Sequence, residues 1–218
     1  MILNTSGTTG TPKQIYQPEY KLNIANVIAR YAQCITKDSK VYTVCKMQHA
    51  GGALAQTLPA REIGATVDIV DFNAYRFMSD IKDYTHTHLT PGHARAIMGT
   101  KAFANADFSG LWVTCGSDIV EWKTITAFVE RGATFMTNWG MTEVGPVAIN
   151  TTFDSIEKVK EYSSLHSAPL LGDVTYCNTR IIDGELHVRG DICVYNDWFA
   201  TGDLAEEVEG KIYYLGRK

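Results

Sequence analysis

The segment best suited to chemistry is the Ser/Thr/Gly-rich stretch NTSGTTGTPK at residues 4–13. Its five hydroxyl side chains can donate to phosphate oxygens, and its two glycines let backbone N–H groups approach an anion closely. Lys13 supplies a compensating positive charge. Ile2 and Leu3 indicate the end of a buried strand, where open α/β sheets bind their ligands. We predict a polyphosphate-binding loop, formed by Thr5, Ser6, Gly7, Thr8, Thr9, Gly10 and Lys13.

This loop differs from the Walker-type loop of common NTPases. Its lysine lies three residues beyond the second glycine, follows Pro12, and is not followed by Ser or Thr. Composition alone would favour a flexible connector, but ten residues of this specificity make that the lesser alternative.

Three later segments carry further residues that could do chemistry. Residues 48–52 read QHAGG, residues 138–143 read NWGMTE, and residues 198–204 read WFATGDL. Glu143 is a hard oxygen donor that suits Mg²⁺. Trp139 offers a flat face, although an aromatic residue at a strand end is more often simply core. Asp203 has two acceptor oxygens that suit a ribose diol, although alone it would be interpreted as a turn residue.

These segments, in this order, resemble the motifs of the adenylate-forming superfamily, which includes acyl-CoA synthetases, peptide-synthetase adenylation domains and luciferases. Gly184–Gly190 (GELHVRG) resembles the family's Gly-Glu-Leu element, and Gly216-Arg217 stands where the family has an Arg before its hinge. The resemblance covers nearly the whole chain. It implies that ATP activates a carboxylic acid as an acyl-adenylate, with an acyl-CoA synthetase as the most similar kind of enzyme.

The resemblance also implies a role for each matching residue. The loop with Lys13 would hold the β- and γ-phosphates, Thr142 the α-phosphate, and Glu143 the Mg²⁺, and these three are the predicted catalytic residues. The adenine and ribose of ATP or AMP would contact Gly116, Trp139, Gly140, Asp203 and Arg217. The acyl pocket would include His49, Ala50, Gly51, Gly116 and Met141. Trp139 stands where the family usually has Tyr, so any role that needs a phenol hydroxyl is lost.

The family pattern extends beyond this sequence at both ends. The resemblance implies a long region before the phosphate loop and a C-terminal domain that supplies a lysine and admits coenzyme A or a pantetheine thiol. The sequence contains neither, and both a natural minimal form and an excised piece stay open. We therefore expect full turnover to need a partner C-terminal domain or carrier protein. The alternatives are a nucleotide-binding or regulatory module that has lost the chemistry, and a structural subunit of a larger synthetase.

The composition argues against several other classes of protein. The chain has 218 residues, of which 45% are hydrophobic and 20% charged, and it has a net charge of −4. Without a Lys/Arg cluster we expect no nucleic-acid binding. Without an apolar run of about 20 residues or a signal peptide we expect no membrane anchor. The five scattered cysteines favour reduced thiols and a cytoplasmic location. We also expect a homodimer that covers an exposed sheet edge.

The pattern of apolar residues predicts an α/β fold. Between residues 14 and 138, short β-rich runs alternate with amphipathic stretches, as in a mainly parallel sheet flanked by helices. After about Asn150 the helical periodicity fades, and turns at Asp183-Gly184 and Glu209-Gly210 punctuate short β-like runs. We predict an α/β nucleotide- and acyl-binding subdomain over residues 1–150 and a small β-rich subdomain over residues 151–218.

Local signals within this pattern predict individual helices. A helix is predicted by apolar residues at helical spacing, namely Ile24, Val27, Ile28, Tyr31 and Ile35. Asn73 and Pro91 each suit a helix start, and Asp118 with Glu121 resembles a capping box.

Four residues suggest alternative chemistry that we do not favour. His86 and His88 would share a strand face, with His93 a helical turn later, so a metal site is conceivable. Isolated histidines are more often structural. Cys115 lacks a sequence-local base, so we expect a buried thiol and not a nucleophile.

Overall fold

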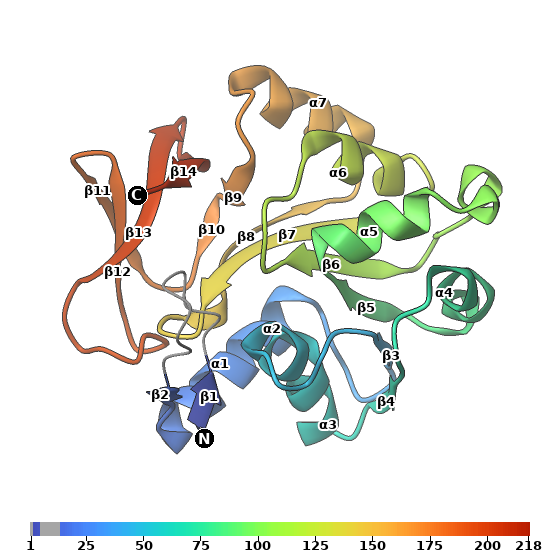
Figure 1. Ribbon diagram of the computed structural model, residues 1–218, viewed down its shortest axis with the longest axis horizontal. Coiled ribbons are helices and arrows are strands. Elements are labelled where there is room, and N and C mark those ends of the chain that lie inside the picture. Colours follow the sequence, from blue (N-terminus) through green and yellow to red (C-terminus); the bar gives the residue numbers. More distant parts are fainter. Residues whose placement is uncertain (1, 5–13) are drawn as a thin grey trace.

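The computed structural model describes residues 2–4 and 14–218, and its largest element is a seven-stranded sheet (Figure 1). The strand order is β10-β8-β7-β6-β5-β3-β4. Neighbours from β4 to β7 run parallel, whereas β8 and β10 are antiparallel to their neighbours. The strands are β3 (Lys40–Thr43), β4 (Thr66–Ile69), β5 (His86–Leu89), β6 (Trp112–Gly116), β7 (Thr134–Met141), β8 (Gly145–Phe153) and β10 (Val174–Thr175). The predicted mainly parallel sheet is confirmed.

Helices cover both faces of this sheet (Figure 1). One face packs against α4 (Ala74–Asp80), α5 (Pro91–Met98), α6 (Trp122–Val129) and α7 (Ile156–Leu165), whose buried side chains share the largest apolar core cluster. The other face packs against α1 (Glu19–Ala32), α2 (Ala50–Gly52), the π-helix η1 (Ala53–Thr57) and α3 (Leu58–Glu62). Two 3₁₀ turns complete the helical layer, η2 (Ile81–Asp83) and η3 (Lys101–Asn105).

A second, antiparallel sheet packs beside the end of β7 (Figure 1). Its order is β11-β12-β13-β14-β9, with β9 (Leu170–Gly172), β11 (Asn178–Ile182), β12 (Glu185–Arg189), β13 (Phe199–Val208) and β14 (Lys211–Arg217). Two-residue turns at Asp183-Gly184 and Glu209-Gly210 have positive φ at both positions, the geometry that tight hairpins favour. These turns confirm the prediction. The subdomain boundary near residue 150 stays a prediction.

The N-terminal strand differs from expectation. β1 (Ile2–Asn4) pairs antiparallel with β2 (Gln14–Tyr16) in a two-stranded ribbon. Ile2 is 62% exposed, so β1 is not the buried sheet strand that we predicted. Residues 5–13, between these two strands, lie outside the described part of the chain.

Helix α1 forms over most of the predicted range but ends before Ile35, and of the predicted apolar face only Ile24 and Ile28 pack against the core from the helix. Val27 and Tyr31 are 52% and 77% exposed, whereas Lys21, Ala25 and Ala29 are buried. Because α1 packs closely against β8 and η1, small side chains fit this interface better than large apolar ones.

Two further local predictions need correction. The proposed capping box is absent, because α6 starts at Trp122 and Glu121 makes no side-chain cap bond. Asp118 instead accepts a hydrogen bond from the backbone N–H of Ile119. Helix α7 was not predicted, since it buries only Val159 and Tyr162 and its apolar stripe is short.

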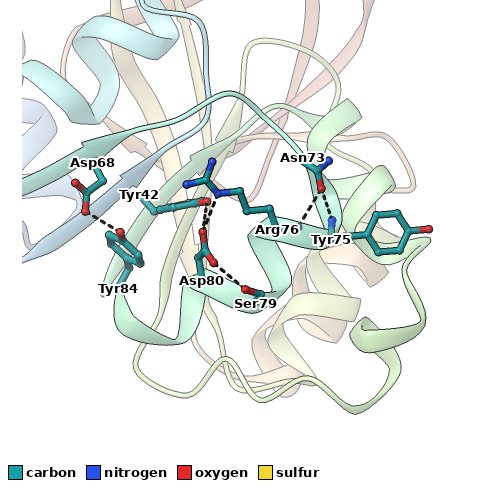
Figure 2. Close-up of polar contacts among 8 residues, drawn as sticks. All are labelled: Tyr42, Asp68, Asn73, Tyr75, Arg76, Ser79, Asp80 and Tyr84. Carbon is teal, nitrogen blue, oxygen red and sulfur yellow. Dashed lines mark hydrogen bonds and ion pairs between the residues drawn. The ribbon is translucent and has the colours of Figure 1, made fainter.

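The start of α4 matches the sequence signal. Asn73 Oδ1 accepts from the backbone N–H groups of Tyr75 and Arg76, both at 3.0 Å (Figure 2). At the other end of α4, Asp80 accepts from the Tyr42 hydroxyl and from Arg76 Nε, each at 3.1 Å. Burial and the Asp80 hydrogen bond raise the pKa of Tyr42 to about 12. These contacts fasten α4 to β3.

Candidate active site

A cavity of about 190 Å³ lies just beyond the carboxyl ends of three parallel strands. Cys45 follows β3, Thr90 follows β5, and Ser117 follows β6. Open α/β sheets bind ligands at this edge. The lining residues are Cys45, Lys46, His49, Gly52, Thr90, His93 and Ser117.

The cavity wall is built on the start of α5. Thr90 Oγ1 accepts from the backbone N–H of His93 at 3.2 Å, and His93 Nδ1 accepts from the backbone N–H of Thr90 at 3.4 Å. The His93 ring also stacks on Phe72, with ring centroids 4.1 Å apart. This double cap and the stacking hold His93 in one orientation at the wall.

The two thiols near the cavity are structural. Cys45 Sγ donates to His88 O at 3.2 Å and lies 3.8 Å from His93 Nδ1. Burial raises the pKa of Cys45 to about 12, so the thiol stays protonated and is a poor nucleophile. Cys115 is fully buried, and burial raises its pKa as well. This agrees with the sequence-based interpretation of Cys115.

The structure brings most of the predicted acyl-pocket residues together. His49 lines the cavity and precedes α2, which begins at Ala50. A Cβ on Gly51 would lie 2.6 Å from Ser117 Oγ, so this glycine packs directly against a cavity residue. Met141 instead packs with the apolar cluster that joins the two sheets.

Two glycines predicted to contact adenine also have a structural reason to lack a side chain. A Cβ on Gly116 would lie 2.4 Å from the backbone oxygen of Asn138, and one on Gly140 would lie 2.2 Å from the backbone oxygen of Gly145. Asn138 Nδ2 donates to Pro146 O at 2.7 Å. Close backbone approach between β6, β7 and β8 therefore requires both glycines.

Three of the five predicted adenine and ribose residues form one contact group. Trp139 Nε1 donates to Asp203 Oδ2 at 2.9 Å, and an Arg217 guanidinium N–H donates to Asp203 Oδ1 at 2.6 Å. The backbone N–H of Asp203 donates to Thr201 Oγ1 at 3.1 Å. Asp203 is 6% exposed. Since each carboxylate oxygen accepts more than one hydrogen bond, this arrangement leaves acceptor capacity for a diol.

Thr142 and Glu143 occupy the turn between β7 and β8. The backbone oxygen of Thr142 accepts from Gln17 Nε2, and that of Glu143 accepts from the backbone N–H of Val194 at 2.8 Å. Chain segments far apart in sequence therefore position this turn.

Buried Lys21 links α1 to the same region. Its ammonium group donates to Cys193 O and lies 3.5 Å from Asp191 O. Sequence reasoning missed Lys21, because its neighbours are about 170 residues away and a lysine on a helix ordinarily indicates an exposed face. It also missed the cavity residues Cys45 and Thr90, although their place just after predicted strands was a usable signal.

Two further predictions concern the phosphate loop and a possible metal site. The phosphate-loop residues Thr5, Ser6, Gly7, Thr8, Thr9, Gly10 and Lys13 lie outside the described residues. Within residues 2–4 and 14–218, no group of three or more His, Cys, Asp or Glu side chains could hold a metal ion. His86 Nε2 instead lies 2.9 Å from Gln33 O, as expected for a structural histidine. No helix in this part of the chain is long and apolar enough to span a membrane.

The order of motifs in the sequence agrees with a family comparison. A family model described as "AMP-binding enzyme" matches residues 1–202. The chain belongs to the AMP-binding family. The predicted membership of the adenylate-forming superfamily is thereby confirmed.

Curated relatives are CoA ligases about twice as long as this chain. The chain is 29% identical to the indoleacetate–CoA ligase of Aromatoleum aromaticum over 250 residues. It is 31% identical to a crotonobetaine/carnitine–CoA ligase of Escherichia coli over 244 residues. Each comparison covers 100% of this chain and 47% of the relative.

Three solved structures show the same fold. ATP-bound MatB from Rhodopseudomonas palustris superposes with a TM-score of 0.83 at 18% identity, covering 99% of this chain and 47% of that one. The McyG A-PCP structure with phenylalanyl-adenylate gives 0.85 at 17% identity, covering 100% and 46%. The N-terminal domain of FACL13 from Mycobacterium tuberculosis gives 0.82 at 19% identity, covering 100% and 60%.

Proposed function

We propose that this chain forms the ATP- and acid-binding core of an adenylate-forming acyl-CoA ligase. The observation that carries the proposal is a continuous series of contacts from the cavity to Asp203. Ser117 lines the cavity, the adjacent Gly116 packs on Asn138, and the next residue, Trp139, donates to Asp203. An acyl group in the cavity and a nucleoside at Asp203 would therefore lie on either side of Gly116.

The proposed reaction joins a carboxylate oxygen to the α-phosphorus of ATP, while the bond to the pyrophosphate oxygen breaks. Trp139 would stack on adenine, and Asp203 with Arg217 would bind the ribose hydroxyls. Thr142 would donate to the α-phosphate, and Lys13 with the Ser/Thr/Gly loop would bind the β- and γ-phosphates. These groups align the reactants and stabilise negative charge that develops in the transition state.

The carboxylate of Glu143 suits Mg²⁺, which prefers hard oxygen ligands and a few protein carboxylates with substrate phosphates. Bound there, Mg²⁺ would neutralise charge on the phosphate oxygens. The chain's own contribution is the position of the carboxylate, which the Val194 hydrogen bond to the Glu143 backbone helps to fix.

The volume of the cavity also limits the size of the acyl group that it can hold. Its volume of about 190 Å³ is below the roughly 300–1,000 Å³ of pockets for drug-sized ligands. We infer a short acyl group, with His49, Ala50 and Gly51 beside it. The acceptor would be coenzyme A or a pantetheine thiol, which a partner C-terminal domain or carrier protein would help to admit. The names of the CoA-ligase relatives and of the A-PCP structure support this extension.

The test is carboxylate-dependent exchange of pyrophosphate into ATP across acids of increasing chain length. We expect exchange with short acids, in the presence of a supplied C-terminal domain from a relative. Asp203→Ala should abolish it, whereas Glu207→Ala, an exposed carboxylate on the same strand, should not. Calorimetric titration with ATP separates the alternatives. Binding without exchange would favour a regulatory module, and no binding would favour a structural subunit.

A further inference from the structure

The cavity at the ends of β3, β5 and β6 has a polar wall without a carboxylate. Its side chains with nitrogen or oxygen atoms are those of Lys46, His49, Thr90, His93 and Ser117. None of the described lining residues is Asp or Glu, and the sequence of residues 5–13 contains neither. A wall of this chemistry suits a ligand group that accepts hydrogen bonds and carries negative charge.

Lys46 supplies the positive charge of this wall. In the described part of the chain, no Asp or Glu oxygen lies within 4.0 Å of its ammonium group. The backbone at Lys46 is held in place, because its carbonyl oxygen accepts from the N–H of His49 at 3.2 Å and a Cβ on Gly52 would lie 2.2 Å from it. The lysine therefore presents an ammonium without a carboxylate partner beside a cavity, where an anion is attracted more strongly than in open water.

His93 and Thr90 supply two neutral donors. The Nδ1 atom of His93 accepts from the backbone N–H of Thr90, and burial lowers the pKa of the His93 ring, so the ring is neutral near pH 7. Its single proton is then on Nε2, where it can be donated to a ligand. Thr90 Oγ1 accepts from the backbone N–H of His93, which leaves the hydroxyl proton of Thr90 to donate as well.

Ser117 adds a hydroxyl at a strained position. Its φ of 71° lies in the left-handed region that favours glycine. A Cβ on Gly51 would lie 2.6 Å from Ser117 Oγ, so the hydroxyl fills the space beside that glycine. Within the described chain this hydroxyl makes no hydrogen bond. A side chain that is kept in a strained conformation without an internal partner is typical of a functional site.

We propose that the cavity selects a short dicarboxylic acid, whose second carboxylate binds Lys46 and accepts hydrogen bonds from Thr90, His93 and Ser117. The selection rests on the proposed function, in which ATP activates the first carboxylate on the other side of Gly116. At roughly 30 Å³ for each water molecule, the cavity of about 190 Å³ holds about six groups of that size. A second carboxylate with about one to three methylene groups fits this space.

A monocarboxylic acid of the same length should bind less well. Its terminal methyl group would leave the ammonium and the three neutral donors without an acceptor inside the cavity. Sites that hydrogen-bond a substrate group discriminate against analogues that lack it, because their own polar groups are left unpaired. Lys46 is exposed, so water screens part of its charge, and we expect a preference of about tenfold rather than of several orders of magnitude.

The first test measures recognition separately from catalysis, by NMR titration of the full chain with succinate and with butanoate in the absence of nucleotide. We expect succinate to shift the backbone amide signals of Lys46, Thr90 and Ser117 and to bind about tenfold more tightly than butanoate. Lys46→Met should remove most of this difference. Lys40→Met, at the exposed opposite end of β3, should retain it. Equal affinities for the two acids in the unsubstituted chain would overturn the proposal.

Ser117→Gly separates the role of the hydroxyl from a structural role. Glycine adopts the left-handed conformation without strain, so urea unfolding should show no loss of stability. The affinity for succinate should nevertheless fall by about threefold, because one donor is lost. An unchanged affinity would contradict the assignment of Ser117 as a donor to the second carboxylate.

Exchange of pyrophosphate into ATP, with a supplied C-terminal domain, then tests the substrate class in the reaction. We expect kcat/KM for succinate to exceed that for butanoate by about tenfold, and this ratio to fall close to one in Lys46→Met. Exchange with equal kcat/KM for both acids would overturn the substrate class while the proposed function stands. Tight binding of succinate through Lys46, with no exchange for any acid, would overturn the proposed function instead, so the two failures are distinguishable.

Discussion

Trp139 Nε1 donates a hydrogen bond to Asp203 Oδ2 over 2.9 Å, and this contact joins β7 of the parallel sheet to β13 of the antiparallel sheet. Both groups are at least nine-tenths buried. A hydrogen bond to a buried charged group is stronger than one between neutral groups. It holds the indole in one plane and positions the carboxylate before any ligand arrives.

Removing the indole N–H should therefore destabilise the chain. Trp139→Phe leaves Asp203 Oδ2 without its donor, and we expect the free energy of unfolding to fall by about 1.5–3 kcal/mol. Urea unfolding measures this change. The matched control is Trp112→Phe, because the Trp112 indole nitrogen is buried without a hydrogen-bond partner in the described structure. If the two substitutions cost the same, the Trp139 contact contributes nothing specific.

The Arg217 contact should matter more for ligand binding than for stability. The Arg217 side chain is 46% exposed, so its pair with Asp203 adds less than about 1 kcal/mol to folding. Under the proposed function it also faces ribose, and Arg217→Ala should lower ATP affinity about tenfold, or ~1.4 kcal/mol. Calorimetry of Arg217→Ala beside Lys218→Ala, which loses the 2.8 Å pair with Glu185, provides the comparison. An equal loss of affinity in both variants would contradict a direct role for Arg217.

The sequence predicted the parts of this fold that depend on local signals. The Asn73 cap, the hairpin turns and the alternation of strands and helices each involve residues close together in the chain, and the structure bears them out. The order of motifs also predicted that Trp139 and Asp203 lie in one nucleotide site, and in the structure their side chains are hydrogen-bonded.

Features that depend on tertiary packing were not predictable in the same way. The burial of Ala25 and Ala29 on α1 follows from its close approach to β8 and η1, which the spacing of the large apolar residues does not indicate. The sequence indicates that Lys21 is a surface residue, whereas in the structure it is buried and donates to the backbone oxygen of Cys193, 172 residues away. The spacing of apolar residues along the sequence does not predict such contacts.

A buried polar network should be a major determinant of stability. Gln33 is fully buried; its Nε2 donates to Ala29 O and Ala55 O, and its Oε1 accepts from Thr114 Oγ1 and Gln56 Nε2. Gln33→Leu removes all four bonds and leaves buried partners unsatisfied. We expect a loss of about 2–4 kcal/mol in the free energy of unfolding.

Urea unfolding of Gln33→Leu against Gln48→Leu checks this expectation. Gln48 is exposed, so its substitution should change stability by no more than about 0.5 kcal/mol. A loss below about 1 kcal/mol for Gln33→Leu would show that the network is replaceable by apolar packing.

His88 should make stability depend on pH. It is 3% exposed on β5, and burial, with a smaller contribution from His93, lowers its pKa from 6.5 to about 4. Between these values the unfolded chain binds a proton that the folded chain does not, so the free energy of unfolding falls as pH is lowered through the window. The full contribution, present above pH 6.5, is about 3 kcal/mol. Burial lowers the pKa of His86 and His93 as well, so both add to the same trend.

The pH dependence of unfolding in His88→Gln isolates the contribution of this residue. The slope of unfolding free energy against pH between 6.5 and 4 should be shallower than in the unsubstituted chain, whereas His187→Gln, on β12 of the other sheet, should leave it unchanged. Carboxylates titrate in the same window, but they cancel when the two variants are compared. An NMR titration of the unsubstituted chain gives an independent reading. A His88 ring that protonates near pH 6.5 while the chain stays folded would contradict the prediction.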